Sequence, residues 1–162
     1  MKKSILVIGL LLLSVSAIVA QSIESKIREF AKSEYPSDYS MQEYIYKKQL
    51  SAYRYMQTVS DSEVKQIALR EYYNDYSMQQ YTYNKQLAAK NYMKTVSDRE
   101  VKQFSLREYP SDYTMQKYTY DKQLGAKNYM NSVTNYSAKA KAVREYPYDY
   151  SMQKYTYDKL VY

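Results

Sequence analysis

The chain has 162 residues and a formal net charge of +7, and it contains 24 tyrosines but no cysteine, histidine or tryptophan. Without cysteine it can form no disulfide and carry no thiolate nucleophile, and without histidine it lacks the side chain that most often serves in general acid–base catalysis. Only two glycines are present, which argues against a β-rich fold with many tight turns.

The first twenty residues have the pattern of a secretory signal peptide. Lysines at positions 2–3 precede an apolar run over residues 5–13, and small residues follow at positions 17–20. We expect cleavage before Gln21, which leaves one domain over residues 21–162. The apolar run is short for a membrane span, so no stable span is expected after cleavage, and an uncleaved anchor is the alternative. The pattern predicts an exported protein, periplasmic or secreted.

A block of 37 residues recurs along the rest of the chain. Copies begin near residues 34, 71, 108 and 145, and the last copy is truncated. Every copy keeps a Glu-Tyr pair, an Asp-Tyr pair, a Met-Gln pair and two tyrosines that stand two residues apart. A period of this length is typical of helical repeats whose units stack on their neighbours.

Each copy predicts a long helix that is introduced by a stop and a cap. Proline follows the Glu-Tyr pair in three copies, and it pushes the preceding residue out of the helical region. The second copy has Tyr73 in that position. We expect the aspartate that follows to be the N-cap of the long helix, with its carboxylate accepting backbone N–H groups, at Asp38, Asp75, Asp112 and Asp149.

A short helix is expected to follow each long one. The long helix runs for about 20 residues, for example over residues 113–133. Capping boxes, Ser60-x-x-Glu63 and Ser97-x-x-Glu100, are expected to open two of the short helices. The third copy lacks this box, and so does the first short helix, which is expected over residues 23–33.

The spacing of apolar residues in the long segment favours a helix with two apolar faces. Met115, Tyr118 and Tyr129 fall on one face, and Tyr120 and Leu124 fall nearly opposite. Such a helix can contact neighbours on both flanks. A strand is the alternative, because Tyr-Thr-Tyr has a high β propensity. The predicted fold is all-α: tandem 37-residue helix-turn-helix repeats, a long helix plus a short helix, stacked as a short solenoid or bundle.

The sequence predicts no catalytic residue, cofactor site or metal site. The best carboxylate of each copy is expected to be a helix cap, and no phosphate-binding loop, dinucleotide motif or calcium loop is present. The recurring Asp-Tyr pair can also be interpreted as a proton relay, and serine–lysine nucleophile pairs remain open on composition alone. The chain is therefore expected not to be an enzyme, and an enzyme of unknown type is the least favoured alternative.

The tyrosines allow two interpretations. They fill the core, with Gln42, Asp38, Lys48 and their copies as partners of the hydroxyl groups, or some stay exposed and bind a sugar polymer or a protein. The candidates for an exposed binding surface are Tyr53, Tyr55, Tyr148 and Tyr162. Aromatic residues interleaved with lysine also occur in single-stranded nucleic-acid sites, but export makes that partner unexpected.

The motif Tyr-Pro-Ser-Asp-Tyr-Ser-Met-Gln-x-Tyr, followed by Lys-Gln-Leu-x-Ala, resembles repeats of bacterial exported proteins of unassigned function. Those repeats carry a Tyr/Trp-Pro-x-Asp-Tyr-x-Met-Gln-x-Tyr core. The resemblance covers the first half of each copy and implies a bacterial, envelope or secreted setting and a helical unit, without an activity. The fourth copy departs from the pattern, because Leu160 stands where the others have Gln49, Gln86 and Gln123.

The function expected from the sequence is that of a non-catalytic structural or protein-binding component of the cell envelope or exterior. The alternative is binding of a glycan or cell-wall polymer through exposed tyrosines. The expected partner is thus a protein or an envelope polymer.

Overall fold

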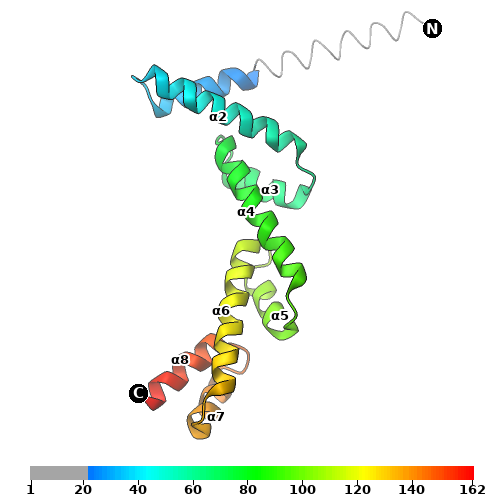
Figure 1. Cartoon of the computed structure of the whole chain (residues 1–162), viewed down its shortest axis with the longest axis vertical. Helices are drawn as coiled ribbons and strands as arrows, with labels where there is room; N and C mark the ends of the chain where they lie inside the picture. Colours follow the sequence, from blue (N-terminus) through cyan, green and yellow to red (C-terminus); the bar gives the residue numbers. More distant parts are fainter. Residues whose placement is uncertain (1–21) are drawn as a thin grey trace, which may run out of the picture. The chain divides into compact units, whose positions relative to one another are not determined.

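The computed structural model describes residues 22–162, and all regular secondary structure in this range is helical (Figure 1). The all-α prediction is therefore confirmed for the described residues. The predicted signal peptide, residues 1–20, lies outside them. No helix among residues 22–162 has both the length and the apolar composition that a membrane span requires.

Long and short helices alternate along the chain. A first short helix covers residues 22–34, close to the predicted 23–33. The other helices are α2 (Tyr39–Thr58), α3 (Ser62–Glu71), α4 (Tyr76–Thr95), α5 (Arg99–Glu108), α6 (Tyr113–Ser132), α7 (Tyr136–Glu145) and α8 (Tyr150–Val161). The long helix predicted over residues 113–133 ends one residue earlier, because Val133 is already extended as the C-cap.

The described residues divide into two compact units, which meet within α4 after residue 81. In the first unit, Ile27 and Ala31 of the first short helix pack with Tyr46 of α2. Half-buried side chains, among them Tyr53 and Tyr76, pack against this cluster. Adjacent helices thus share a small core within the unit.

The second unit repeats this arrangement with two clusters. Met93 of α4, Val101 of α5 and Tyr120 of α6 form the first cluster, and Met130 of α6 packs with Tyr157 of α8 in the second. Two buried alanines of α7 complete the second cluster, Ala138 and Ala142. Small residues on the short helix let the long helices approach closely, so that methionine and tyrosine fill the space between them.

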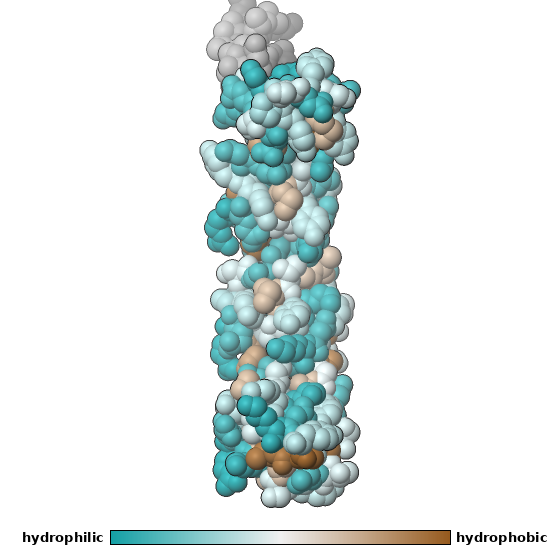
Figure 2. All heavy atoms as spheres, turned by 90° about the vertical axis from the view of Figure 1, so that its left-hand side faces the viewer, coloured by the Kyte–Doolittle hydropathy of each residue, from teal (hydrophilic) through white to brown (hydrophobic). Residues whose placement is uncertain are grey.

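The face of the molecule that Figure 2 shows is mostly hydrophilic. On this face, hydrophobic residues form small separate groups among hydrophilic ones. Isolated apolar side chains of this kind are normal on a protein surface and do not by themselves mark an interface.

Candidate functional site

The four repeated aspartates are used at the starts of the long helices. Each carboxylate accepts a hydrogen bond of 3.0–3.1 Å from the backbone N–H three residues later, with the pairs Asp38–Met41, Asp75–Met78, Asp112–Met115 and Asp149–Met152. This satisfies one of the donors that a helix start leaves unpaired. The carboxylates therefore have a local structural role as helix caps.

A buried glutamine joins each long helix to the start of the next. In the first unit, Gln49 Nε2 donates to Asp75 Oδ1 at 2.8 Å, and Gln49 Oε1 accepts from the Ser77 N–H at 3.1 Å. In the second unit, Gln86 and Gln123 donate in the same way to Asp112 and Asp149, at 3.0 and 2.7 Å. We call these three glutamines the connector glutamines. The sequence did not reveal this role, because the two partners are distant along the chain.

The environment of Asp112 shows how strongly this junction favours the carboxylate. Burial alone raises the pKa of Asp112, but hydrogen bonds from the Thr114 hydroxyl, the Met115 N–H and Gln86 outweigh it and lower the pKa below its ordinary value. The fourth copy has Leu160 at the connector position, and that side chain is exposed. Leu160 has no amide group and therefore cannot make the bonds of a connector glutamine.

The second repeated glutamine holds the turn between the helices. Gln42 Nε2 donates to the Tyr35 carbonyl at 2.7 Å, and its copies make the same bond at 2.6–2.7 Å, with the pairs Gln79–Tyr72, Gln116–Tyr109 and Gln153–Tyr146. The prediction that these glutamines bind tyrosine hydroxyls is wrong. The last carbonyls of a helix need partners, and the glutamine amide supplies one.

The caps of the short helices differ from the predicted capping boxes. Asp61, Asp98 and Asn135 are the N-caps, each accepting a bond of 3.1 Å from the N–H three residues later. Ser60 and Ser97 stand one residue too early. Glu63 and Glu100 are consequently the second helical residues, and a capping box needs the third. Asn135 caps α7 in the third copy, where the sequence offered no capping box.

The two repeated tyrosine columns have opposite environments. Tyr46, Tyr83, Tyr120 and Tyr157 are only 2–8% exposed, whereas Tyr44, Tyr81, Tyr118 and Tyr155 are 52–59% exposed. Residues two apart on a helix point in nearly opposite directions, which separates the columns. We call the second set the tyrosine column. The sequence did not single it out, although the invariant spacing of two was a signal that one member faces away from the core.

The tyrosines that were predicted to form a binding surface divide in the same way. Tyr148 and Tyr162 are exposed. Tyr53 is half-buried, and its ring packs edge-on against Tyr76 with centroids 5.1 Å apart. Tyr55 is also half-buried. Tyr53 thus belongs to the packing of the first unit, because α4 begins beside it.

An ion cluster joins α5, α6 and α8 in the second unit. Lys127 Nζ lies 2.9 Å from Asp98 Oδ2 and 3.0 Å from Glu100 Oε2. The Tyr150 hydroxyl donates to the same Glu100 oxygen at 2.7 Å. The hydrogen bond from Lys127 lowers the pKa of Asp98, and the bonds from Tyr150 and Lys127 lower that of Glu100. All three charges are therefore held in their ionised forms.

Two further tyrosines in this unit are fixed by aspartates. Tyr92 donates to Asp121, and Tyr129 donates to Asp158. The hydrogen bond to the aspartate raises the pKa of each phenol to about 12. Both phenols consequently stay protonated at neutral pH and act as donors.

No known protein family matches the chain, and no curated protein or solved structure is significantly similar to it.

Proposed function

We propose that the chain is a non-catalytic helical-repeat protein of the cell envelope or exterior, which holds a partner protein on a repeated tyrosine surface. In this proposal, each 37-residue copy is a helix-turn-helix unit, and the units stack as a short solenoid or bundle. The observation that carries the proposal is the near-equal exposure of the tyrosine column, 52–59% in all four copies. The setting rests on the signal-peptide pattern.

The roles of the polar groups support a non-catalytic protein. The repeated aspartates cap helices, the connector glutamines cross-link helices, and the phenols of Tyr92 and Tyr129 have pKa values of about 12. A general base works best with a pKa near the working pH, and a phenol with so high a pKa is unsuited to that role. These polar groups are engaged in hydrogen bonds that stabilise the helices and their contacts.

The tyrosine column supports a binding role. Tyrosine offers a large rigid apolar ring with a polar tip, and it is enriched among the residues that dominate binding energy at interfaces. These rings are not needed for the core, since the buried column fills that space. The same side chain stands in the same helical position of each copy and is similarly exposed there.

Sedimentation of the purified protein, without its signal segment, with envelopes from the source organism tests this function. The test variant replaces all four residues of the tyrosine column by serine. The control replaces two other exposed tyrosines, Tyr39 and Tyr136, which are 78% and 76% exposed. We expect the wild type and the control to bind, and the column variant to lose most of its binding. Equal binding by both variants would refute the proposal.

Glycan binding is a second candidate, favoured by the lysine that accompanies one exposed ring. Lys159 Nζ lies 4.4 Å from the centroid of the Tyr155 ring. An aromatic face beside a hydrogen-bond donor is suited to a sugar. Treating the envelopes with protease separates the two candidates. Binding that disappears supports a protein partner, and binding that survives and transfers to purified cell-wall polysaccharide supports the glycan.

A further inference from the structure

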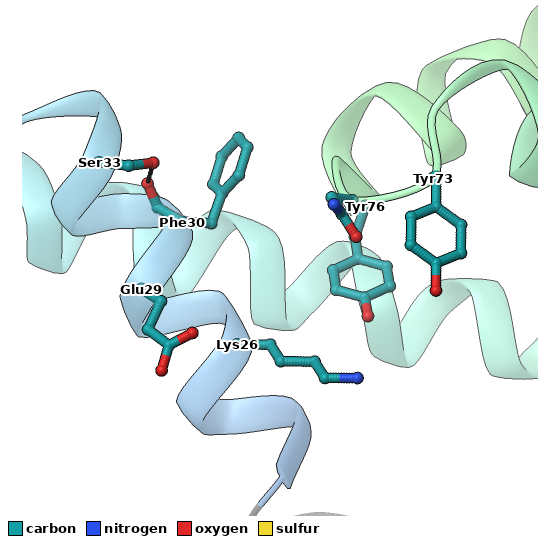
Figure 3. Close-up of a pocket in the computed structure, with 7 residues that line it drawn as sticks. Lys26, Glu29, Phe30, Ser33, Tyr73 and Tyr76 are labelled. Carbon is teal, nitrogen blue, oxygen red and sulfur yellow. Dashed lines mark hydrogen bonds between the residues drawn. The ribbon is translucent and has the colours of Figure 1, made fainter.

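A groove in the first unit lies between the first short helix and the start of α4. It is lined by Lys26, Glu29, Phe30 and Ser33 from the helix and by Tyr73, Asn74 and Tyr76 from the segment that leads into α4. Its volume is about 480 Å³. Figure 3 shows Lys26 extending across the groove, with its ammonium group toward the hydroxyl ends of Tyr76 and Tyr73. We call it the Lys26 groove.

The same positions of the repeat are filled differently in the second unit. Tyr76 corresponds to Tyr150 and Tyr53 to Lys127, while Lys26 corresponds to Glu100. In the second unit, the Glu100 carboxylate accepts bonds from the Tyr150 hydroxyl at 2.7 Å and from Lys127 at 3.0 Å. The chain therefore already contains one example of a carboxylate bound at this position by a phenol and an ammonium group.

The first unit keeps the phenol donor, Tyr76, but has Tyr53 in place of Lys127 and Lys26 in place of the carboxylate. Lys26 stands at the glutamate position, and within residues 22–162 no acidic group pairs with it. The Tyr76 hydroxyl has no hydrogen-bond partner in the same range. Burial, together with the neighbouring phenols of Tyr53 and Tyr73, raises the pKa of Tyr76, so its hydroxyl remains a neutral donor.

Glu29 is the acidic residue that lines this groove. In Figure 3, its carboxylate lies farther from Tyr76 than the Lys26 ammonium group does, and its position in the repeat is that of Gln103. It therefore does not occupy the place that Glu100 takes in the second unit. Two donors, one of them charged, are left facing the groove.

The walls of the groove are aromatic. Phe30 is half-buried, and Tyr73 is 82% exposed on the other side. Tyr73 stands where the other three copies have proline, so this ring is peculiar to the first unit. A second groove, of about 430 Å³, shares Lys26, Tyr73 and Tyr76 with the first and continues toward Leu69. The two grooves therefore adjoin at these residues.

We propose that the Lys26 groove binds a carboxylated sugar chain of the uronic acid class. The sugar carboxylate accepts hydrogen bonds from Lys26 Nζ and the Tyr76 hydroxyl, a phenol and an ammonium group like those that bind Glu100 in the second unit. The sugar ring lies between Phe30 and Tyr73, and the neighbouring groove receives the next sugar. A bond to a charged group is stronger than a neutral one, which makes the carboxylate the main anchor.

Side-chain chemistry favours a sugar over an acidic peptide. The residues that line the groove come from helices and a helix start, so they offer no strand edge for pairing with a peptide backbone. Two aromatic faces beside a carboxylate anchor suit the C–H faces of a pyranose. This site does not depend on the tyrosine column, so it stands or falls separately from the proposed function.

Calorimetric titration with trigalacturonate at low ionic strength tests the proposal, with the fully methyl-esterified trisaccharide as the matched neutral ligand. We expect the acid to bind and the ester to bind at least about tenfold more weakly, since the ester removes the charge and keeps the rings. Equal affinities would overturn the proposal. Tighter binding of triglutamate than of trigalacturonate would overturn it as well, because the ligand would then be a peptide.

Substitutions in the groove test whether trigalacturonate binds there. Lys26→Gln and Tyr76→Phe should each weaken trigalacturonate binding, the first by about tenfold or more. Lys47→Gln removes the same charge from an exposed position of α2 outside the groove and should leave the affinity unchanged. Tyr73→Pro installs the residue of the other copies, and Tyr73→Leu removes the aromatic face without that change; each should weaken binding. Retained affinity in Lys26→Gln, with helical content equal to the wild type, would refute the assignment.

Discussion

The two units share one helical repeat but carry opposite charges at one position, Lys26 in the first unit and Glu100 in the second. In both, a connector glutamine bonds the aspartate that caps the next long helix. In the second unit, Glu100 is bound by both Lys127 and Tyr150. In the first, Lys26 and Tyr53 replace the charged pair, and the phenol of Tyr76 packs edge-on against Tyr53. The comparison shows that the repeat keeps its junction and varies what lies beside it.

The shared junction should give the largest effect. Gln123→Leu places at this junction the residue that the fourth copy has at position 160. It leaves the Asp149 carboxylate and the Ser151 N–H without their buried partner. We expect a loss of about 2–3 kcal/mol in the free energy of unfolding, measured by urea denaturation followed by circular dichroism. Gln49→Leu should cost a similar amount in the first unit.

The control for this prediction is Gln103→Leu, since Gln103 is exposed on α5. A change within about 0.5 kcal/mol is expected there. If the connector and control variants were equally stable, the buried hydrogen bonds would not stabilise the repeat, and adjacent helices would be held by hydrophobic packing alone.

The ion cluster should give the next largest effect, and only in the second unit. Lys127→Met leaves Asp98 and Glu100 without their cation, and we expect a loss of about 1 kcal/mol in the free energy of unfolding at neutral pH. The Lys127 side chain is 21% exposed, so water and salt screen part of the interaction. Raising the salt concentration should reduce the difference from the wild type.

The same cluster predicts a pH dependence. The pKa values of Asp98 and Glu100 are lowered in the folded state, so their stabilisation is present above their unfolded pKa values, about 4. It is lost as the pH falls through the lowered values. Lys127 has a raised pKa, so its contribution is present below about pH 10 and is lost at higher pH. Urea titrations should show a weaker decline toward acid in Lys127→Met than in the wild type.

The sequence alone could predict the features that depend on residues close together along the chain. The aspartate caps follow from local spacing, because a cap and its N–H partner are three residues apart. The short-helix caps were misplaced because Ser60 and Asp61 are both good caps, and the local sequence does not choose between them. The separation of Tyr44 from Tyr46 follows from helical geometry, but which of them is buried depends on where the neighbouring helices lie. The Gln49–Asp75 junction could not be found, since nothing local links the two residues.

Exchanging the variable position should convert one unit into the other. Lys26→Glu combined with Tyr53→Lys gives the first unit the residues of the second, and the introduced lysine can pair with the introduced carboxylate as Lys127 pairs with Glu100. We expect stability within about 1 kcal/mol of the wild type, because one partly exposed ion pair replaces the aromatic contact of Tyr53. Trigalacturonate binding should disappear, since a carboxylate of the chain then occupies the groove. Retained binding would show that the two positions are not equivalent.

The smallest effect is expected from the tyrosine column. Replacing Tyr44, Tyr81, Tyr118 and Tyr155 by serine removes rings that are more than half exposed, so each change should alter the free energy of unfolding by about 0.5 kcal/mol or less. Tyr120→Ser, which empties a buried position of the α5–α6 core, should cost several times more, about 3 kcal/mol or above. Urea denaturation of both variants measures the contrast. A large cost from the exposed column would mean that these rings pack against the fold, and it would remove the reason to assign them to a partner.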